Sequence, residues 1–155
     1  MSVHDTMEGF AAALPPMQAL IGLDLGDKTT GVAVTSRMLP VATPLETIRR
    51  RRFGLDAERL MQIVADRASG GVILGLPRNM DGSEGPRCQS TRAFVRNLEK
   101  LTALPVVFWD ERMSTMAVTR TLLDADASRA RRAELVDKMA AAYILQGALD
   151  RLRKL

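Results

Sequence analysis

The stretch IGLDLGDKTTGVAV, Ile21 to Val34, places one carboxylate, Asp24, in the middle of an apolar segment with the length of a β-strand. A glycine turn and a second apolar strand follow it. Because an unpaired buried carboxylate is costly, a strand seldom carries one without a partner or a function. The stretch therefore predicts two antiparallel strands joined by a tight turn, with Asp24 as a candidate functional residue.

Two classes of protein open on this acid-glycine pattern: ATPases of the Hsp70, actin and sugar-kinase type, and metal-dependent nucleases of the ribonuclease H type. The ATPases bind nucleotide between two lobes and carry a second acid-glycine motif. At 155 residues the chain has room for one domain, and Asp24-Leu25-Gly26 is its only Asp-x-Gly. Size therefore weighs against the ATPase.

Composition narrows the chemistry further. The only histidine is His4 and the only cysteine is Cys88, which excludes Ser-His-Asp and Cys-His catalysis and any histidine-rich zinc site. A formal charge of +4 and a pI near 9.8 favour polyanionic partners such as nucleic acid. A lone cysteine fits a reducing compartment, and neither a secretory signal nor a membrane span is present. We expect a cytoplasmic protein that does not interact with membranes.

The periodicity predicts a flexible N-terminal tail over residues 1–18 and a single domain over residues 19–155. Strands are expected at Ala19–Gly26, Thr30–Ser36, Val41–Thr47, Val72–Leu76 and Pro105–Trp109. Helices are expected at Leu55–Ala68, Pro86–Leu101, Thr115–Leu123 and Glu134–Arg153, with a basic connection over Asp124–Arg132. The fold class is α/β: a mixed five-stranded sheet, with a three-strand antiparallel meander and then two parallel strands, covered by helices. This order is that of a ribonuclease H-like domain.

Three further acids stand where acids are unexpected. On a helical wheel Asp137 falls within the apolar face of the last helix, although an interaction with the helix dipole or with an arginine would also explain it. Asp110 and Glu111 end a buried strand, where sites of α/β sheets gather, although loop polarity or helix capping is the alternative. Because side chains alternate along a strand, only one of these two is expected beside Asp24.

Carboxylates from Asp24, Asp110 or Glu111, and Asp137 would converge at one sheet edge if their strands are neighbours. Three such groups need a cation, since like charges would otherwise force proton uptake. Ligation by oxygen alone selects Mg²⁺ or Mn²⁺, and two such ions about 3.5–4 Å apart promote phosphodiester hydrolysis.

Four segments, in order, resemble the YqgF/RuvX family, proteins of ribonuclease H-like fold described as Holliday junction resolvases and as nucleases that trim precursor 16S rRNA. The resemblance runs from Ile21 to Asp150. The segments are Gly22–Gly26 with Lys28 and Gly31–Ala33; Gly75–Pro77 with Asn79–Gly85; Asp110–Arg112 with Ser114, Thr115 and Ala117; and Val136-Asp137 with Ala140, Ala141 and Ile144–Gln146.

The resemblance implies that Asp24, Glu111 and Asp137 are the catalytic acids and metal ligands, with Asp110, Arg112 and Lys28 in support. The family usually has a basic residue after the lysine, whereas Thr29 stands there in this chain. That departure puts a phosphate contact at this point in doubt.

The loop Pro77 to Pro86 is either a strand-guiding loop beside the metals, with Asn79 and Ser83 as polar contacts, or a surface connection. The run Arg49 to Arg52 would either neutralise phosphates or form a solvated turn. Three arginines before the last helix are the better candidates for substrate contacts: Arg129, Arg131 and Arg132. With 4% aromatic residues, recognition of backbone and shape is expected rather than base stacking.

The sequence thus predicts a nuclease that hydrolyses phosphodiester bonds with two divalent ions, acting at the 5′ end of precursor 16S rRNA in ribosome biogenesis. One alternative is a Holliday junction resolvase in DNA recombination and repair, which would cut twice as a homodimer. Another is a non-catalytic nucleic-acid-binding module on the same fold.

Overall fold

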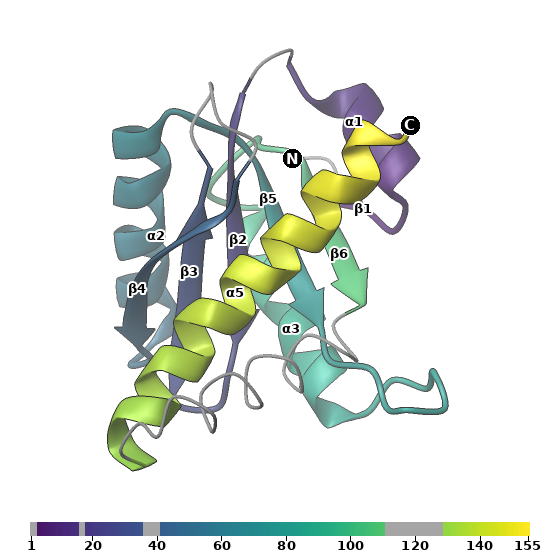
Figure 1. Ribbon diagram of the computed structural model, residues 1–155. Coiled ribbons are helices and arrows are strands. Elements are labelled where there is room, and N and C mark those ends of the chain that lie inside the picture. The colour runs from purple at the N-terminus through teal and green to yellow at the C-terminus, as the bar shows by residue number, and fades with distance from the viewer. Residues whose placement is uncertain (1–2, 16–17, 36–40, 111–128) are drawn as a thin grey trace.

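The computed structural model describes residues 3–15, 18–35, 41–110 and 129–155, except for the side chains of residues 129–137. Its core is a mixed sheet in the order β1-β6-β5-β2-β3-β4 (Figure 1). The strands are β1 (Val3–His4), β2 (Ala19–Leu25), β3 (Thr29–Val34), β4 (Thr43–Arg49), β5 (Ser69–Leu76) and β6 (Val106–Asp110). β2, β3 and β4 form an antiparallel meander, whereas β5, β6 and β1 continue the sheet in parallel with β2.

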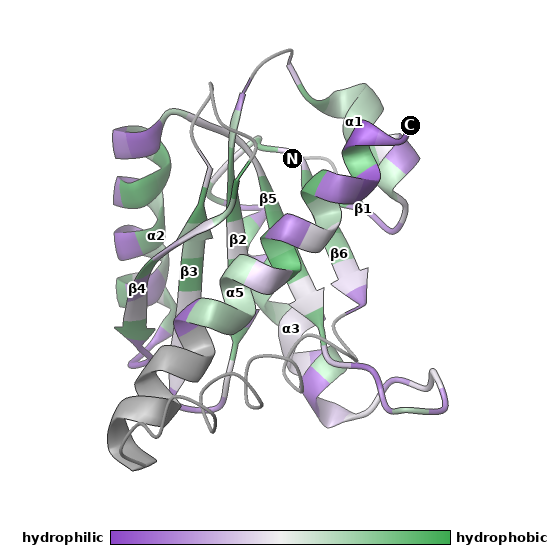
Figure 2. Cartoon of the chain, viewed as in Figure 1, coloured by the Kyte–Doolittle hydropathy of each residue, from purple (hydrophilic) through white to green (hydrophobic). Residues whose placement is uncertain are grey.

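Helices cover both faces of the sheet and make a three-layered molecule (Figure 1). On one face, α2 (Phe53–Arg67) and α3 (Pro86–Leu98) pack on the odd-numbered leucines of β2. On the other face, α1 (Met7–Ala13) and α5 (Arg129–Arg153) pack on the alternate side chains of the same strands. On α2, for example, the green apolar residues lie on the side toward the sheet and the purple hydrophilic ones on the side away from it (Figure 2). The sheet therefore has two separate cores, and each strand residue belongs to one of them.

The close approach of α5 depends on Gly22. A Cβ at this position would stand 2.7 Å from the Leu145 Cβ and 2.9 Å from the Ala141 carbonyl oxygen. Glycine therefore lets the helix backbone lie almost on β2, which brings α5 close to the strand that carries Asp24.

The N-terminal segment corrects two expectations. β1 pairs in parallel with β6, so the sheet has six strands rather than five. Residues 1–18 were expected to form a flexible tail, but α1 packs on α5 with Phe10 fully buried and Met7 nearly so. The expectation is wrong for the described part of this segment, because the tail buries apolar side chains that a short sequence pattern does not reveal.

The last helix also differs from the prediction. α5 begins at Arg129 rather than at Glu134, so Arg129 to Arg132 are helical and do not belong to a connection. The helix predicted at Thr115–Leu123 lies outside the described residues. The other predicted strands and helices are confirmed, with small shifts at their ends. Within the described part of the chain, no helix has both the length and the apolar character to cross a membrane.

Candidate active site

Asp24 lies near the carboxyl end of β2, a central strand of the sheet, and only 8% of its surface is exposed. Side chains alternate along a strand, so Asp24 shares its face with Gly22, the residue against which α5 packs. Leu23 and Leu25 belong to the core on the opposite face. Asp24 is therefore a nearly buried carboxylate on the α5 side of the sheet, within a strand whose other side chains are apolar or absent.

Three parallel strands end at the same edge as Asp24. Leu23 of β2 pairs with Leu74 of β5, and Gly75 of β5 pairs with Trp109 of β6. This register puts Trp109 at the level of Asp24 and on the same face, where its ring would lie 3.0 Å from a Cβ at Gly147 of α5. The edge formed by the carboxyl ends of β2, β5 and β6 is where ligands of open α/β sheets bind.

Asp110 lies on the other face. It pairs with Leu76, and it follows Trp109 by one residue, so it has the same orientation as Phe108. Leu76 and Phe108 both belong to the core under α2 and α3. Asp110 thus does not share a face with Asp24.

α5 extends toward the same edge. Ala141 and Leu145, which lie over Gly22, are fully buried on the helix face that packs on the sheet. Position 137 precedes Ala141 by one helical turn, so the backbone at Asp137 lies in the same row of the helix. The side chains of Asp137, Arg129, Arg131 and Arg132 are not described, and Glu111 and Arg112 lie outside the described residues.

Asp24 offers the kind of donor that a divalent ion requires. A nearly buried carboxylate at the carboxyl edge of the sheet supplies hard oxygen ligands, which suit Mg²⁺ or Mn²⁺. Among the residues whose side chains are described, no three acidic, histidine or cysteine residues form a metal-binding group. Asp24 fits such an ion, whereas the side chains of the other two predicted ligands, Glu111 and Asp137, lie outside the described ones.

The turn after Asp24 is held by two arginines, Arg50 from the run Arg49 to Arg52 and Arg87 from the start of α3. Arg50 Nη1 donates to the Gly26 carbonyl at 2.6 Å, and Arg87 Nη2 donates to the Leu25 carbonyl at 3.4 Å. Arg50 is half-buried within the run Arg49 to Arg52, whereas its three neighbours in the run are exposed. The run of arginines can be recognised in the sequence, but only the tertiary structure shows that Arg50 is the member that points inward. Lys28 is exposed in the same turn, and its carbonyl accepts from the Arg50 amide at 2.8 Å.

Asn79 and Ser83 lie in the loop after β5 and contact each other. Asn79 Nδ2 donates to Ser83 Oγ at 3.0 Å, and Ser83 Oγ donates to Asp81 Oδ1 at 2.6 Å. The positive φ of Gly82, 88°, completes this closed turn. The two predicted contact residues therefore shape the loop by bonding within it.

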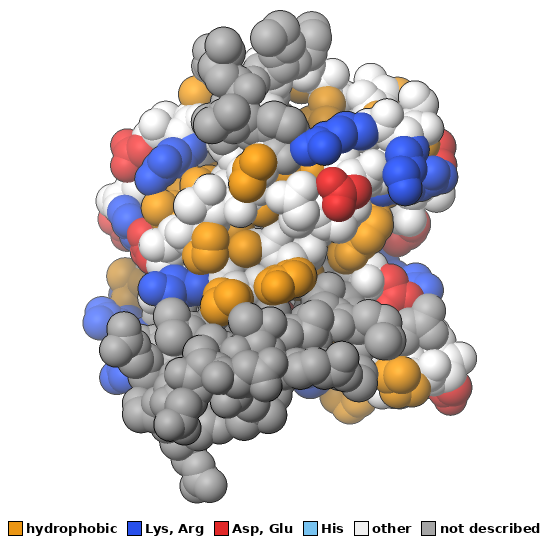
Figure 3. All heavy atoms as spheres, viewed as in Figure 1, with side chains coloured by type: hydrophobic (Ala, Val, Ile, Leu, Met, Phe, Trp, Pro, Cys, Tyr) orange, Lys and Arg blue, Asp and Glu red, His pale blue; other side chains and the backbone are white. Residues whose placement is uncertain are grey.

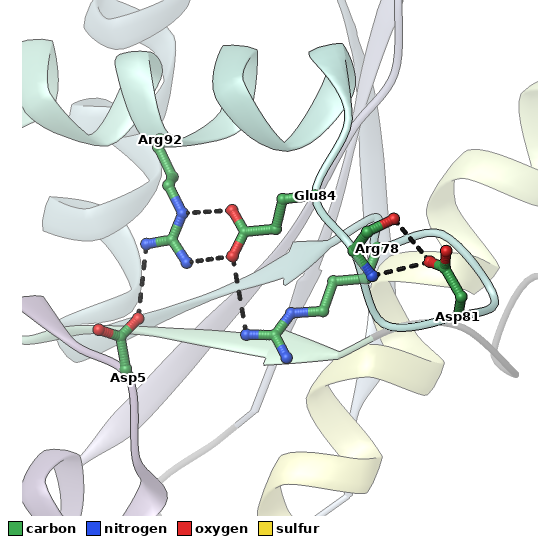
Figure 4. Close-up of polar contacts among 6 residues, drawn as sticks. Asp5, Arg78, Asp81, Glu84 and Arg92 are labelled. Atoms are coloured by element: carbon green, nitrogen blue, oxygen red, sulfur yellow. Dashed lines mark hydrogen bonds and ion pairs between the residues drawn. The ribbon is translucent and has the colours of Figure 1, made fainter.

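A group of ion pairs attaches this loop to the rest of the molecule (Figure 4). Arg92 of α3 donates two hydrogen bonds to the Glu84 carboxylate, at 2.8 and 2.9 Å, and its Nη1 lies 3.5 Å from Asp5. The guanidinium also lies over the Phe108 ring, 4.8 Å from its centroid. The hydrogen bond from Arg92 holds the pKa of Glu84 below its ordinary value. The loop, α3 and the N-terminal segment are thereby tied together beside the candidate site.

On the face that α5 covers, described basic and acidic side chains are interspersed with exposed apolar ones (Figure 3). The described part of this face therefore shows no single basic stripe of the kind that tracks a nucleic-acid backbone. Arg50 and Arg87 lie instead at the carboxyl edge of the sheet, where each donates to a backbone carbonyl.

Known proteins are similar in sequence to this chain along almost its whole length. The RuvX family model, described as Holliday junction resolvase, matches residues 18–151. A protein of Ruegeria pomeroyi is 68% identical over 153 residues, covering 99% of each chain. One of Ruegeria sp. strain TM1040 is 67% identical, covering 97% of this chain and 96% of the relative. Both are named "Putative pre-16S rRNA nuclease".

Solved structures resemble the fold. Thermus thermophilus RuvC aligns with 88% of this chain and 96% of its own, with a TM-score of 0.53 and 16% identity. T. thermophilus RuvC in complex with a Holliday junction substrate covers 86% and 94%, with a TM-score of 0.51 and 17% identity. This likeness confirms the predicted ribonuclease H-like fold class.

Proposed function

This chain belongs to the RuvX family and is a nuclease that hydrolyses phosphodiester bonds, and we propose that it trims the 5′ end of precursor 16S rRNA with the aid of divalent ions. The observation that carries the proposal is Asp24, a nearly buried carboxylate at the carboxyl edge of a central strand. The names of the two Ruegeria relatives favour this substrate.

Asp24, Glu111 and Asp137 would hold the ions. The position of Asp110 on the opposite face of the sheet supports Glu111, rather than Asp110, as the second ligand. The row of α5 that contains Ala141 and position 137 supports Asp137 as the third. Bound divalent ions would lower the pKa of the attacking water and stabilise the leaving oxygen.

The protein's own groups position the reaction. The backbone of Asp24 pairs with Gly31 of β3, and the strand before it, Ala19 to Leu23, also pairs with β5, so its carboxylate would need little reorganisation. The acids would hold the ions rather than attack the phosphorus, and a water molecule would be the nucleophile. Arg112 and Lys28 would support the site. Contacts to the substrate backbone would come from the loop and from the first turns of α5: Asn79, Ser83, Arg129, Arg131 and Arg132.

The alternative substrate is a four-way DNA junction, which the description of the family favours. Resolution of a junction requires two symmetric cuts, and therefore a homodimer. An enzyme that trims RNA can act as a monomer. The two candidates share the same site and the same chemistry, so only the substrate separates them. We also propose that the protein acts in the cytoplasm, where precursor rRNA is processed.

The test compares cleavage of end-labelled precursor 16S RNA and of a mobile four-way DNA junction, each with Mn²⁺ or with EDTA. Asp24→Asn keeps the size of the side chain and removes its charge, and Asp66→Asn, at an exposed position of α2, is the matched control. We expect wild type and Asp66→Asn to cut the RNA only with metal. Asp24→Asn should be slower by about a thousand-fold, which corresponds to about 4 kcal/mol of transition-state stabilisation.

Preference for the junction would move the assignment to recombination. Binding without cleavage of either substrate by wild type would reject the catalytic proposal and favour a non-catalytic binding module.

A further inference from the structure

We propose that a small basic pocket next to the candidate active site binds a backbone phosphate of the nucleic-acid strand, adjacent to the phosphate that is cut. This proposal deepens the proposed function and rests on it. The pocket has a volume of about 80 Å³ and lies between the β2–β3 turn, the end of β4 and the first turns of α3. It has room for a small anionic group such as a phosphate.

Two guanidinium groups line the pocket. Arg50 reaches it from the end of β4 and is anchored by its bond to the Gly26 carbonyl. Arg87 reaches it from the start of α3 and bonds the Leu25 carbonyl. An arginine has five N–H donors, and in each case one of them is bound to these carbonyls. The two side chains are thus held in place with donors to spare, as a phosphate site requires.

The charge of the pocket is positive. Neither Arg50 nor Arg87 forms an ion pair with any acidic side chain that the structure describes. Asp27 also lines the pocket, but it is one carboxylate against two guanidinium groups. This differs from Arg59 and Arg92, each of which is paired with a glutamate. Arg50 and Arg87 therefore have charge available for an external anion.

α3 adds to this attraction. The helix begins at Pro86, directly before Arg87, so the positive end of its dipole lies at the pocket. The hydroxyl groups of Ser90 and Thr91 lie along the same wall. Thr91 Oγ1 donates to the Arg87 carbonyl at 3.0 Å, which ties it to the helix, whereas Ser90 is exposed. Ser90 can thus supply a further hydrogen-bond donor to a phosphate oxygen.

The position of the pocket indicates which phosphate it binds. The pocket is lined by α3 and Leu25, which belong to one face of the sheet, whereas Asp24 belongs to the other face. Asp24 of the candidate active site and Leu25 of the pocket are consecutive residues of β2, but they face opposite sides of the sheet, so the strand lies between the two sites. A single phosphate cannot occupy both, so the pocket holds a neighbouring phosphate and positions the strand across the end of β2.

The test measures binding without cleavage. Fluorescence anisotropy of a labelled precursor 16S RNA fragment, and in parallel of a four-way DNA junction, is recorded in EDTA at several KCl concentrations. The test variant is Arg50→Gln with Arg87→Gln. The matched control is Arg67→Gln with Arg96→Gln, which removes the same charge at exposed positions of α2 and α3. A third variant, Arg50→Lys with Arg87→Lys, keeps the charge without the guanidinium fork.

We expect the Gln test variant to bind at least about tenfold more weakly than wild type at about 0.1 M salt, with a salt slope lower by about one. The control should change affinity less than about twofold. The Lys variant should recover the slope, because the charge remains. If the Gln test variant loses affinity for the RNA or for the junction, that nucleic acid is the one whose backbone supplies the phosphate. Equal affinities of the test and control variants would overturn the proposal, and so would a Lys variant that binds as weakly as the Gln variant.

The outcomes separate the two proposals. If wild type shows arginine-dependent binding but cuts neither substrate, the proposed function fails and the phosphate site stands. If wild type cuts RNA and the Gln test variant binds it as tightly as wild type does, the phosphate site fails alone. If wild type binds neither nucleic acid in EDTA, the phosphate site is rejected.

Discussion

Individual side chains around the loop after β5 show how local charge positions a functional segment. Glu84 accepts two hydrogen bonds from Arg92 and lies 3.8 Å from Arg78, so one carboxylate connects the loop to α3 (Figure 4). Asp5 joins the same group from the N-terminal segment. Because all these groups are partly exposed, the ion pairs orient the loop more than they stabilise the fold.

Glu84→Gln should make stability less dependent on pH in acid. Arg92 holds the pKa of Glu84 below its ordinary value of 4.5, so the carboxylate stabilises the fold at pH values above 4.5. This contribution is lost as the pH falls through the lowered pKa. Urea denaturation between pH 7 and pH values below 4.5 should therefore find the variant less stable than wild type at pH 7, with the difference shrinking as the pH falls below 4.5. Glu99→Gln, at an exposed position after α3, should follow wild type throughout. A difference that stays the same at both ends of this range would contradict the assignment.

At the scale of elements, the site depends on how closely α5 packs on β2. α5 crosses the face of the sheet (Figure 1), and position 137 precedes by one helical turn Ala141, which packs against Gly22 of β2. Gly22 sets the separation, because the helix backbone occupies the space of a side chain there. Any change in that separation moves the backbone of α5 relative to Asp24.

Gly22→Ala should therefore lower both stability and activity. The new Cβ would meet the Leu145 Cβ at 2.7 Å and the backbone of Ala141 at 2.9 Å, so α5 must shift. We expect a loss of about 2–3 kcal/mol in the free energy of unfolding, measured by urea denaturation, and a lower kcat at a temperature where the variant is folded. Gly54→Ala in α2 is the control, since a Cβ there meets nothing within 4 Å. It should leave the protein as stable or gain up to about 1 kcal/mol. If the two variants had equal free energies of unfolding, α5 would be able to move away from the new Cβ without loss of stability.

At the scale of the whole molecule, the candidate site joins segments far apart in the sequence. β2, the end of β6 and α5 come together only after the sheet has formed and α5 has packed across it, with Trp109 of β6 beside Gly147 of α5. An ion held jointly by these segments would stabilise the native state alone, because the unfolded chain cannot assemble its ligands.

Divalent ions should accordingly raise the stability of wild type. At a free Mn²⁺ concentration of about 100 times Kd, the free energy of unfolding should increase by about 2.7 kcal/mol. Asp24→Asn should show little of this increase and Asp66→Asn all of it, as measured by thermal or urea denaturation with and without the ion. An increase of the same size in Asp24→Asn would place the ion elsewhere.

Much of this organisation is determined by the sequence alone. Continuous apolar runs with the length of strands, alternating with amphipathic segments, predicted the order of the central strands and helices, because burial on two faces requires such runs. Asp24 stood out for the same reason: a carboxylate in an otherwise apolar strand is costly unless it has a role. These signals are local, so they can be recognised in one sequence.

Other features were decided only by the tertiary structure. β1 has two residues and α1 has seven, too few for a local pattern, and they are stabilised by pairing with β6 and packing on α5. The face of Asp110 depends on the register between β5 and β6. Arg50 is the arginine of its run that points inward, because it bonds the Gly26 carbonyl, 24 residues away in the sequence. Such outcomes depend on pairings between distant segments, and a distant pairing is specified by the shape of the assembled sheet rather than by any one stretch of chain.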